Sequence, residues 1–197
     1  MLRTTCPNIS VITNFGCRAN CWYCIWKGHE LENVDNPTDW VKLEKFLYDN
    51  REKGKVSVSG GGDCLYRYDI HIDWWIKFFK ITSHLNMLVD VHTREKFAYQ
   101  YFWKKYINRC VFSSDVLEKD SEYLEYLSRL TKIRITHLVT ADTTFEMIDS
   151  YISFKNKIKC QFTIKELVGY SDDGMYEKIR QKYPEVYHLD NGDYNIY

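Results

Sequence analysis

Three cysteines stand close together near the start of the chain, in the pattern C-x3-C-x2-C: Cys17, Cys21 and Cys24. Thiolates are the ligands of iron–sulfur clusters, and close spacing lets a single loop bind several irons. Three thiolates on a four-iron cluster would leave one iron without a protein ligand, and an open coordination position allows a metal to bind a substrate. The trio therefore favours cluster chemistry at an accessible iron.

Two simpler interpretations of these cysteines stay open. A structural zinc ion would need a fourth ligand, and His29 follows the trio by five residues. Zinc loops favour two paired ligand knuckles, however, and no second pair is present. The cysteines could instead be ordinary buried side chains. The remaining cysteines form no CxxC pair, which predicts no auxiliary cluster: Cys6, Cys64, Cys110 and Cys160.

A second segment with binding potential is a glycine run that follows a predicted strand over residues 55–59. It consists of Gly60, Gly61, Gly62 and Asp63. Glycines let the backbone approach a ligand closely, although such a run taken alone is usually a turn. Polar residues also follow later predicted strands, and each is at least as well explained as a helix cap or a solvated turn: Arg94, Ser113 and Asp115.

These segments lie between elements that alternate regularly along the chain. Apolar and β-branched runs alternate with helical patterns, which is typical of parallel βα units. The predicted strands are residues 9–14, 55–59, 87–92, 110–113, 133–139 and 159–164. The predicted helices are residues 38–53, 72–79, 95–107, 121–132, 145–152 and 173–182. The tail, residues 187–197, is left unassigned.

Six βα units indicate an α/β protein, because a closed eight-unit barrel needs about 200–250 residues or more. We therefore expect a partial (βα)6 TIM-like barrel formed by a single domain, residues 1–197, with an open doubly wound sheet as the structural alternative. Both architectures bind ligands at the carboxyl ends of their strands. The cysteine loop and the glycine run follow predicted strands at such ends.

In these two segments the sequence resembles the radical SAM superfamily, in which C-x3-C-x-aromatic-C follows the first strand of a partial barrel. Tyr23 occupies the aromatic position. The family also has a Gly-Gly-Glu-Pro-like motif after the second strand, and the glycine run matches it with two departures, Asp63 for glutamate and Cys64 for proline. The specific motifs are confined to residues 14–26 and 59–65.

The resemblance implies that the three thiolates hold an oxygen-sensitive 4Fe–4S cluster whose open iron binds S-adenosylmethionine (SAM). Tyr23 would then lie near the adenine, and the glycine run with Asp63 would bind the methionine ammonium group. Arg94 would anchor a carboxylate or the substrate, while Ser113 and Asp115 would meet the ribose or carboxylate of SAM. The reduced cluster would cleave SAM to a 5′-deoxyadenosyl radical that takes hydrogen from a small-molecule or nucleotide substrate. A one-electron donor such as flavodoxin or ferredoxin would be the partner.

Other functions remain as alternatives. Within the family, a short chain could be an activase that installs a glycyl radical on a partner protein. The short relative 7-carboxy-7-deazaguanine synthase ranks lower, because its glycine-rich segment before the cluster is missing here. Outside catalysis, the chain could be an iron–sulfur electron carrier or a zinc-stabilised binding module.

Composition limits the partners. The 27 basic and 27 acidic residues balance, so we expect no strong footprint for nucleic acid. The start of the chain lacks the apolar region of a signal peptide, and no run is long enough to span a membrane. We therefore expect a cytoplasmic protein without a membrane partner, and the odd count of 7 cysteines argues against a disulfide framework.

Overall fold

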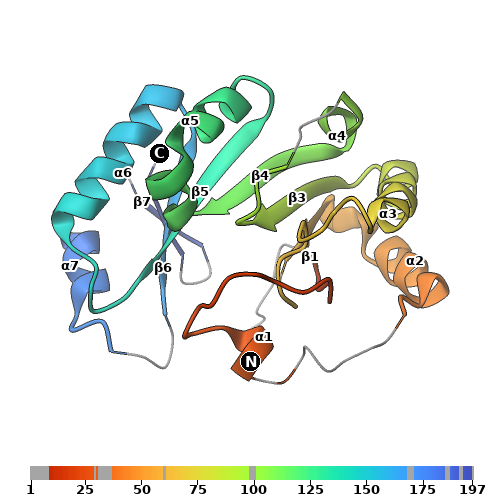
Figure 1. Cartoon of the computed structure of the whole chain (residues 1–197), viewed down its shortest axis with the longest axis horizontal. Helices are drawn as coiled ribbons and strands as arrows, with labels where there is room; N and C mark the ends of the chain where they lie inside the picture. The colour runs from red at the N-terminus through yellow and green to blue at the C-terminus, as the bar shows by residue number, and fades with distance from the viewer. Residues whose placement is uncertain are drawn as a thin grey trace. The chain divides into compact units, whose positions relative to one another are not determined.

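A computed structural model shows an α/β protein that divides into two compact units, Met1–Cys110 and Val111–Tyr197 (Figure 1). The structure describes residues 9–28, 30, 37–59, 61–97, 101–167, 171–184, 187–190 and 193–196. His29, Gly60 and Cys6, which entered the sequence arguments, lie outside these ranges. Among the residues described, no helix has the length and apolar character needed to cross a membrane.

The first unit is built on three parallel strands in the order β1 (Ile9–Val11), β2 (Lys55–Val58) and β3 (Leu88–Thr93). Val11 pairs with Val58, and Val58 pairs in turn with Val91. The strands therefore end side by side, which brings the segments that follow β1, β2 and β3 to the same edge. Its helical elements are α1 (Ile25–Gly28), α2 (Trp40–Asp49), the 3-10 helix η2 (Arg51–Lys53), α3 (Ile72–His84) and α4 (Tyr101–Tyr106).

Aromatic side chains form much of the core of this unit. Trp75, Phe78 and Phe79 of α3 are fully buried, and the Trp75 ring meets that of Trp103 from α4 at a centroid distance of 5.6 Å. The sequence pattern predicts an apolar face on this helix, and the structure adds Phe78 to it. Burying an aromatic side chain of this size contributes about 2–3 kcal/mol. The core thus fixes α3 and α4 close to the strands that carry the candidate site.

Strand β4 (Ile107–Ser113) begins three residues earlier than the sequence predicts. Its first residues include Asn108 and Arg109, whose polar side chains conceal the strand pattern. Both bond to the buried carboxylate of Asp90 on β3: Asn108 Nδ2 donates over 2.8 Å, and Arg109 forms an ion pair. The helix predicted over 95–107 is shorter in the structure, where α4 spans Tyr101–Tyr106.

The second unit contains β5 (Lys132–Val139) and β6 (Gln161–Glu166), which are parallel and pair Val139 with Glu166. Its helices are α5 (Ser114–Ser128), α6 (Phe145–Ile158) and α7 (Met175–Lys182), and α6 lies alongside α5 (Figure 1). Two further strands, β7 (Tyr187–Asp190) and β8 (Asp193–Ile196), form an antiparallel pair, and β8 adds antiparallel to β6. The tail that the sequence leaves unassigned thus extends the sheet.

Helix α5 differs most from its predicted range. It begins at Ser114 rather than at residue 121, and Asp120 inside it has non-helical backbone angles of φ −142° and ψ 41°. The periodic leucines that predict the helix lie after this break, with Leu124 and Leu127 buried. The part of α5 before the break, which begins at Ser114, has no such leucine pattern and is therefore not predicted from the sequence.

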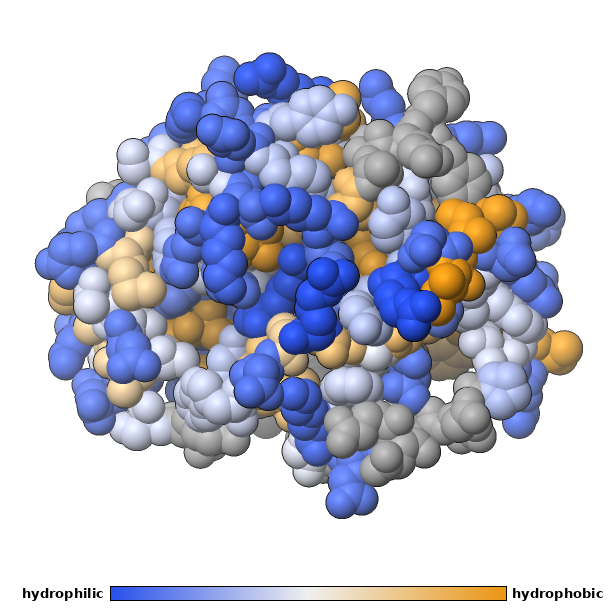
Figure 2. All heavy atoms as spheres, viewed as in Figure 1, coloured by the Kyte–Doolittle hydropathy of each residue, from blue (hydrophilic) through white to orange (hydrophobic). Residues whose placement is uncertain are grey.

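Large apolar side chains that are well exposed are scattered in the described part of the chain. They include Ile12, Trp22, Val41 and Ile70. Hydrophilic side chains predominate on the face shown in Figure 2, and hydrophobic ones occur there in small groups. Scattered exposed apolar residues of this kind are normal for a folded domain.

Candidate cluster and cofactor site

The cysteine loop follows β1 and is held by local backbone bonds. Cys17, Cys21 and Cys24 are all half-buried free thiols. The Ala19 amide donates to Cys17 Sγ over 3.3 Å, and the Cys24 amide donates to the Cys21 carbonyl oxygen over 3.3 Å. Burial raises the pKa of the Cys17 thiol, helped by the nearby Asp63 carboxylate and the two other cysteines. Thiols in such surroundings lose their protons when a metal binds and supplies positive charge.

The glycine run after β2 packs directly on the segment that follows β1. A Cβ on Gly61 would lie 1.8 Å from the Thr13 carbonyl oxygen, and one on Gly62 would lie 2.3 Å from the Gly16 carbonyl oxygen. Both glycines also have positive φ angles, +59° and +99°. Gly16 and Gly62 form a parallel bridge, and the Asp63 amide donates to the Gly16 carbonyl oxygen over 2.8 Å. The two predicted motifs are therefore in direct backbone contact.

Asp63 turns inward and binds the chain itself. Its side chain is only 5% exposed, and it accepts hydrogen bonds from the Leu65 amide at 2.9 Å, the Thr93 hydroxyl at 2.6 Å and the Arg94 amide at 2.6 Å. Burial raises the pKa of this carboxyl group, and the three hydrogen bonds act against that rise. The carboxylate thus ties the loop after β2 to the end of β3.

Arg94 reaches from the end of β3 to the cysteine loop. Its Nη1 lies 2.7 Å from Cys21 Sγ and its Nη2 lies 2.9 Å from the Tyr23 hydroxyl oxygen. The side chain is half-buried. Together with the Asp63 contact, these bonds connect the segments after all three strands of the first unit.

Arg18, which lies in the cysteine loop itself, is arranged differently. Arg18 forms an ion pair with Glu95 at 2.9 Å, and its own side chain is 70% exposed while that of Glu95 is 11% exposed. Its guanidinium also lies 5.7 Å from the centre of the Tyr66 ring. This pair is a further link between the cysteine loop and the segment after β3.

The other predicted site residues belong to the second unit. Ser113 is the N-cap residue of α5, and Asp115 lies in the first turn of that helix. The Ser113 side chain makes no capping hydrogen bond to this helix. An acidic residue in the first turn is favourable at a helix start whatever the function. The structure thus gathers Cys21, Tyr23 and Asp63 around Arg94, and places Ser113 and Asp115 at a helix start.

Two residues of the gathered set were not among the predicted site residues. Gly16 stands directly before the first cysteine with φ +91° and contacts Gly62, and Thr93 anchors Asp63. A glycine beside a metal-binding pattern was a signal that could have been used. The role of Thr93 has no local signal, because it depends on the parallel pairing of β2 and β3.

The donor set of the cysteine loop consists of the thiols of Cys17, Cys21 and Cys24. In the described ranges, no group of three His, Cys, Asp or Glu side chains is arranged to hold one metal ion. A cluster makes a different demand, because each thiolate binds a different iron. Three free, half-buried thiols on one loop fit a 4Fe–4S cluster in type and number.

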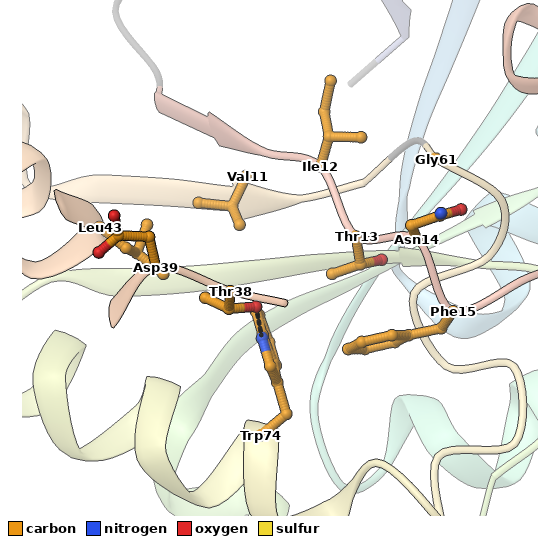
Figure 3. A pocket seen from close by; sticks show the side chains of 10 residues that line it. All are labelled: Val11, Ile12, Thr13, Asn14, Phe15, Thr38, Asp39, Leu43, Gly61 and Trp74. Atoms are coloured by element: carbon orange, nitrogen blue, oxygen red, sulfur yellow. Dashed lines mark hydrogen bonds between the residues drawn. The ribbon is translucent and has the colours of Figure 1, made fainter. Parts of the chain in front are cut away.

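A pocket of about 390 Å³ lies beside the segment after β1. Val11, Thr13 and Phe15 point toward Thr38 and Trp74, whereas Ile12 points away (Figure 3). Trp74 Nε1 donates to Thr38 Oγ1 over 2.8 Å at its wall. Gly61 of the glycine run is among the residues that line the pocket, and no cysteine of the described ranges is.

Comparison with known proteins adds no family assignment. No protein-family model matches the chain, and no curated protein matches it either.

Proposed function

We propose that this protein is a radical SAM enzyme whose catalytic site lies at the carboxyl ends of β1, β2 and β3. The observation that carries the proposal is the contact between two separate motifs: the loop of Cys17, Cys21 and Cys24 and the run of Gly61, Gly62 and Asp63. Each motif alone has ordinary explanations. Their backbone contact is what a shared cofactor site requires.

Each group of residues would have a separate role in binding the cluster and SAM. Cys17, Cys21 and Cys24 would each bind one iron of a 4Fe–4S cluster, leaving the fourth iron for the amino and carboxylate groups of SAM. Close backbone packing at Gly61 and Gly62 would bring peptide groups near the methionine part of SAM. When bound, the cluster would supply one electron to the sulfonium of SAM, which breaks the carbon–sulfur bond to give methionine and a 5′-deoxyadenosyl radical.

The chain itself would supply orientation and exclusion of competing reactions. The ring of Tyr23 would flank the adenine. The substrate, a small molecule or nucleotide in this proposal, would lose a hydrogen atom to the radical. We further propose that the fold is a partial TIM-like barrel, and the parallel pairing of β1 with β2, of β2 with β3 and of β5 with β6 supports this proposal.

Anaerobic reconstitution tests the proposal. Protein loaded with iron and sulfide should bind about four irons and, with dithionite and SAM, should release 5′-deoxyadenosine. Cys21→Ala should abolish this product, whereas Cys160→Ala, which removes a buried cysteine of the second unit, should leave it intact. A four-iron protein that never cleaves SAM would instead be an electron carrier, and stable binding of one zinc without iron would make the loop structural.

A further inference from the structure

The charged group of Arg94 is directed at a sulfur atom. Its terminal nitrogens lie 2.7 Å from Cys21 Sγ and 2.9 Å from the Tyr23 hydroxyl oxygen. An arginine that clamps a carboxylate uses these same terminal nitrogens in a bidentate pair. In this structure both are directed at the cysteine loop.

The position of Arg94 is fixed from behind by Asp63. The Arg94 amide donates to Asp63 Oδ2, while the Asp63 Oδ1 atom accepts from the Leu65 amide and the Thr93 hydroxyl. Because three donors of the chain already bind this buried carboxylate, its role here is to hold the end of β3. Arg94 then projects from that fixed point to Cys21.

A cation that donates to a ligand sulfur affects the reduction of the cluster. Hydrogen bonds to the sulfur atoms and net charge are among the factors that set cluster potentials. Reduction adds one negative charge to the cluster, and a charged hydrogen bond stabilises the more negative state further. A guanidinium on Cys21 therefore favours the reduced form.

We propose that Arg94 is a positioning residue that raises the reduction potential of the cluster through its hydrogen bond to Cys21, and that Asp63 holds Arg94 in place. This inference rests on the proposed function, since it requires a cluster on Cys21. It assigns Arg94 to the cluster rather than to a carboxylate of SAM or substrate. An enzyme that must accept an electron from a biological donor benefits because its cluster is then easier to reduce.

The test compares two arginines of the same site. Arg94→Met and Arg18→Met each remove one positive charge, but Arg18 is 70% exposed and paired with Glu95. Redox titration of the reconstituted proteins, followed by electron paramagnetic resonance, should show about a tenfold lower ratio of reduced to oxidised cluster in Arg94→Met at a fixed potential. Tenfold corresponds to about 59 mV for one electron. Arg18→Met should change the ratio by less than about twofold, because exposed charges are screened. Arg94→Lys, which keeps the charge, should fall between wild type and Arg94→Met.

Equilibrium binding of SAM separates this role from that of a carboxylate anchor. Arg94→Met should retain SAM affinity within about threefold, since the loss of a charged pair to a carboxylate would cost tenfold or more. Reduced SAM affinity with an unchanged potential would overturn the inference, as would equal potential shifts in the two methionine variants. A wild-type protein that takes up no cluster refutes the proposed function and this inference together. A loaded wild-type protein whose potential equals that of Arg94→Met refutes the inference alone.

Discussion

The contact between the glycine run and the segment after β1 can be measured without any cofactor. Gly61 and Gly54 both have positive φ angles, +59° and +68°, but their surroundings differ. A Cβ on Gly61 would lie 1.8 Å from the Thr13 carbonyl oxygen, while a Cβ on Gly54 would meet nothing within 4 Å. Alanine at the two positions therefore separates the conformational cost from the cost of the close approach.

The expected magnitudes follow from these surroundings. Placing alanine in the left-handed region costs about 1–2 kcal/mol, and the reduced freedom of the unfolded chain returns about 0.4–1 kcal/mol. Gly54→Ala should therefore lower the free energy of unfolding by about 1 kcal/mol. Gly61→Ala bears the same terms, and in addition the Thr13 backbone must shift. Overpacking of this kind costs about 1–3 kcal/mol, so we expect a total of about 2–4 kcal/mol.

Urea unfolding of the cofactor-free protein, followed by tryptophan fluorescence and circular dichroism, gives both values. The slopes of the transitions should agree among wild type, Gly54→Ala and Gly61→Ala, so that the free energies can be compared. If Gly61→Ala costs no more than Gly54→Ala, the glycine run does not press on the Thr13 backbone. The contact that supports the proposed function would then be lost.

Two further stability predictions concern buried polar groups. Thr93→Val removes a donor from the buried Asp63 carboxylate and should cost about 1–3 kcal/mol in urea unfolding, whereas Thr93→Ser, which keeps the hydroxyl group, should cost less. A Thr93→Val variant as stable as wild type would show that the hydrogen bond to Asp63 does not contribute to stability. His137 is bonded to Ser114 and Thr143, and burial lowers its pKa to about 4, so the folded state favours the neutral ring. Its contribution to stability should be complete above the unfolded pKa of about 6.5 and should fall by about 3 kcal/mol between pH 6.5 and pH 4. The free energy of unfolding, measured across this range, should fall more steeply with acid in wild type than in His137→Gln. Parallel curves for the two proteins would contradict a neutral, buried His137 in the folded state.

The sequence predicts the order of the elements well, because their apolar patterns are local. The buried strands β2 and β3 and the aromatic face of α3 all appear where the pattern indicates. The predicted ends of the elements are wrong where contacts with residues distant in sequence determine the secondary structure. The start of β4 is polar in sequence, so no strand is predicted there. It belongs to the strand because Asn108 and Arg109 bond to Asp90, eighteen and nineteen positions away.

The antiparallel strands of the tail were missed for a similar reason. A regular alternation of βα units favours parallel pairing, and nothing in that pattern indicates a reversal at the end. In the structure β8 pairs antiparallel with β6, with Phe162 opposite Ile196. A strand of four residues at the end of a chain carries too little periodicity to be distinguished from a loop.

For the candidate site, the sequence identifies the residues but not their mutual bonds. The cysteine spacing and the glycine run are visible in one dimension. The attachment of Asp63 to Thr93 and Arg94 spans about thirty positions of sequence and exists only because β2 and β3 lie side by side. The spacing of polar residues in the sequence therefore suggests that each of them contacts a ligand. The pairing of the strands determines which of these residues bond to one another instead.

Position 63 is an aspartate, whereas the motif that this segment resembles has a glutamate there. The lengths of these two side chains give the departure a structural consequence. An aspartate carboxylate stays close to its own backbone, where the Leu65 amide and the segment from Thr93 to Arg94 supply three donors. A glutamate is longer by one methylene group, and its carboxylate would extend past those donors. The shorter side chain thus links the segment after β2 to the end of β3 through hydrogen bonds. Arg94, whose amide is one of these donors, extends its guanidinium group toward the cysteine loop. Because the Arg94 guanidinium contacts Cys21 Sγ, the Asp63 carboxylate is linked to the cysteine loop through Arg94 rather than by a direct side-chain contact.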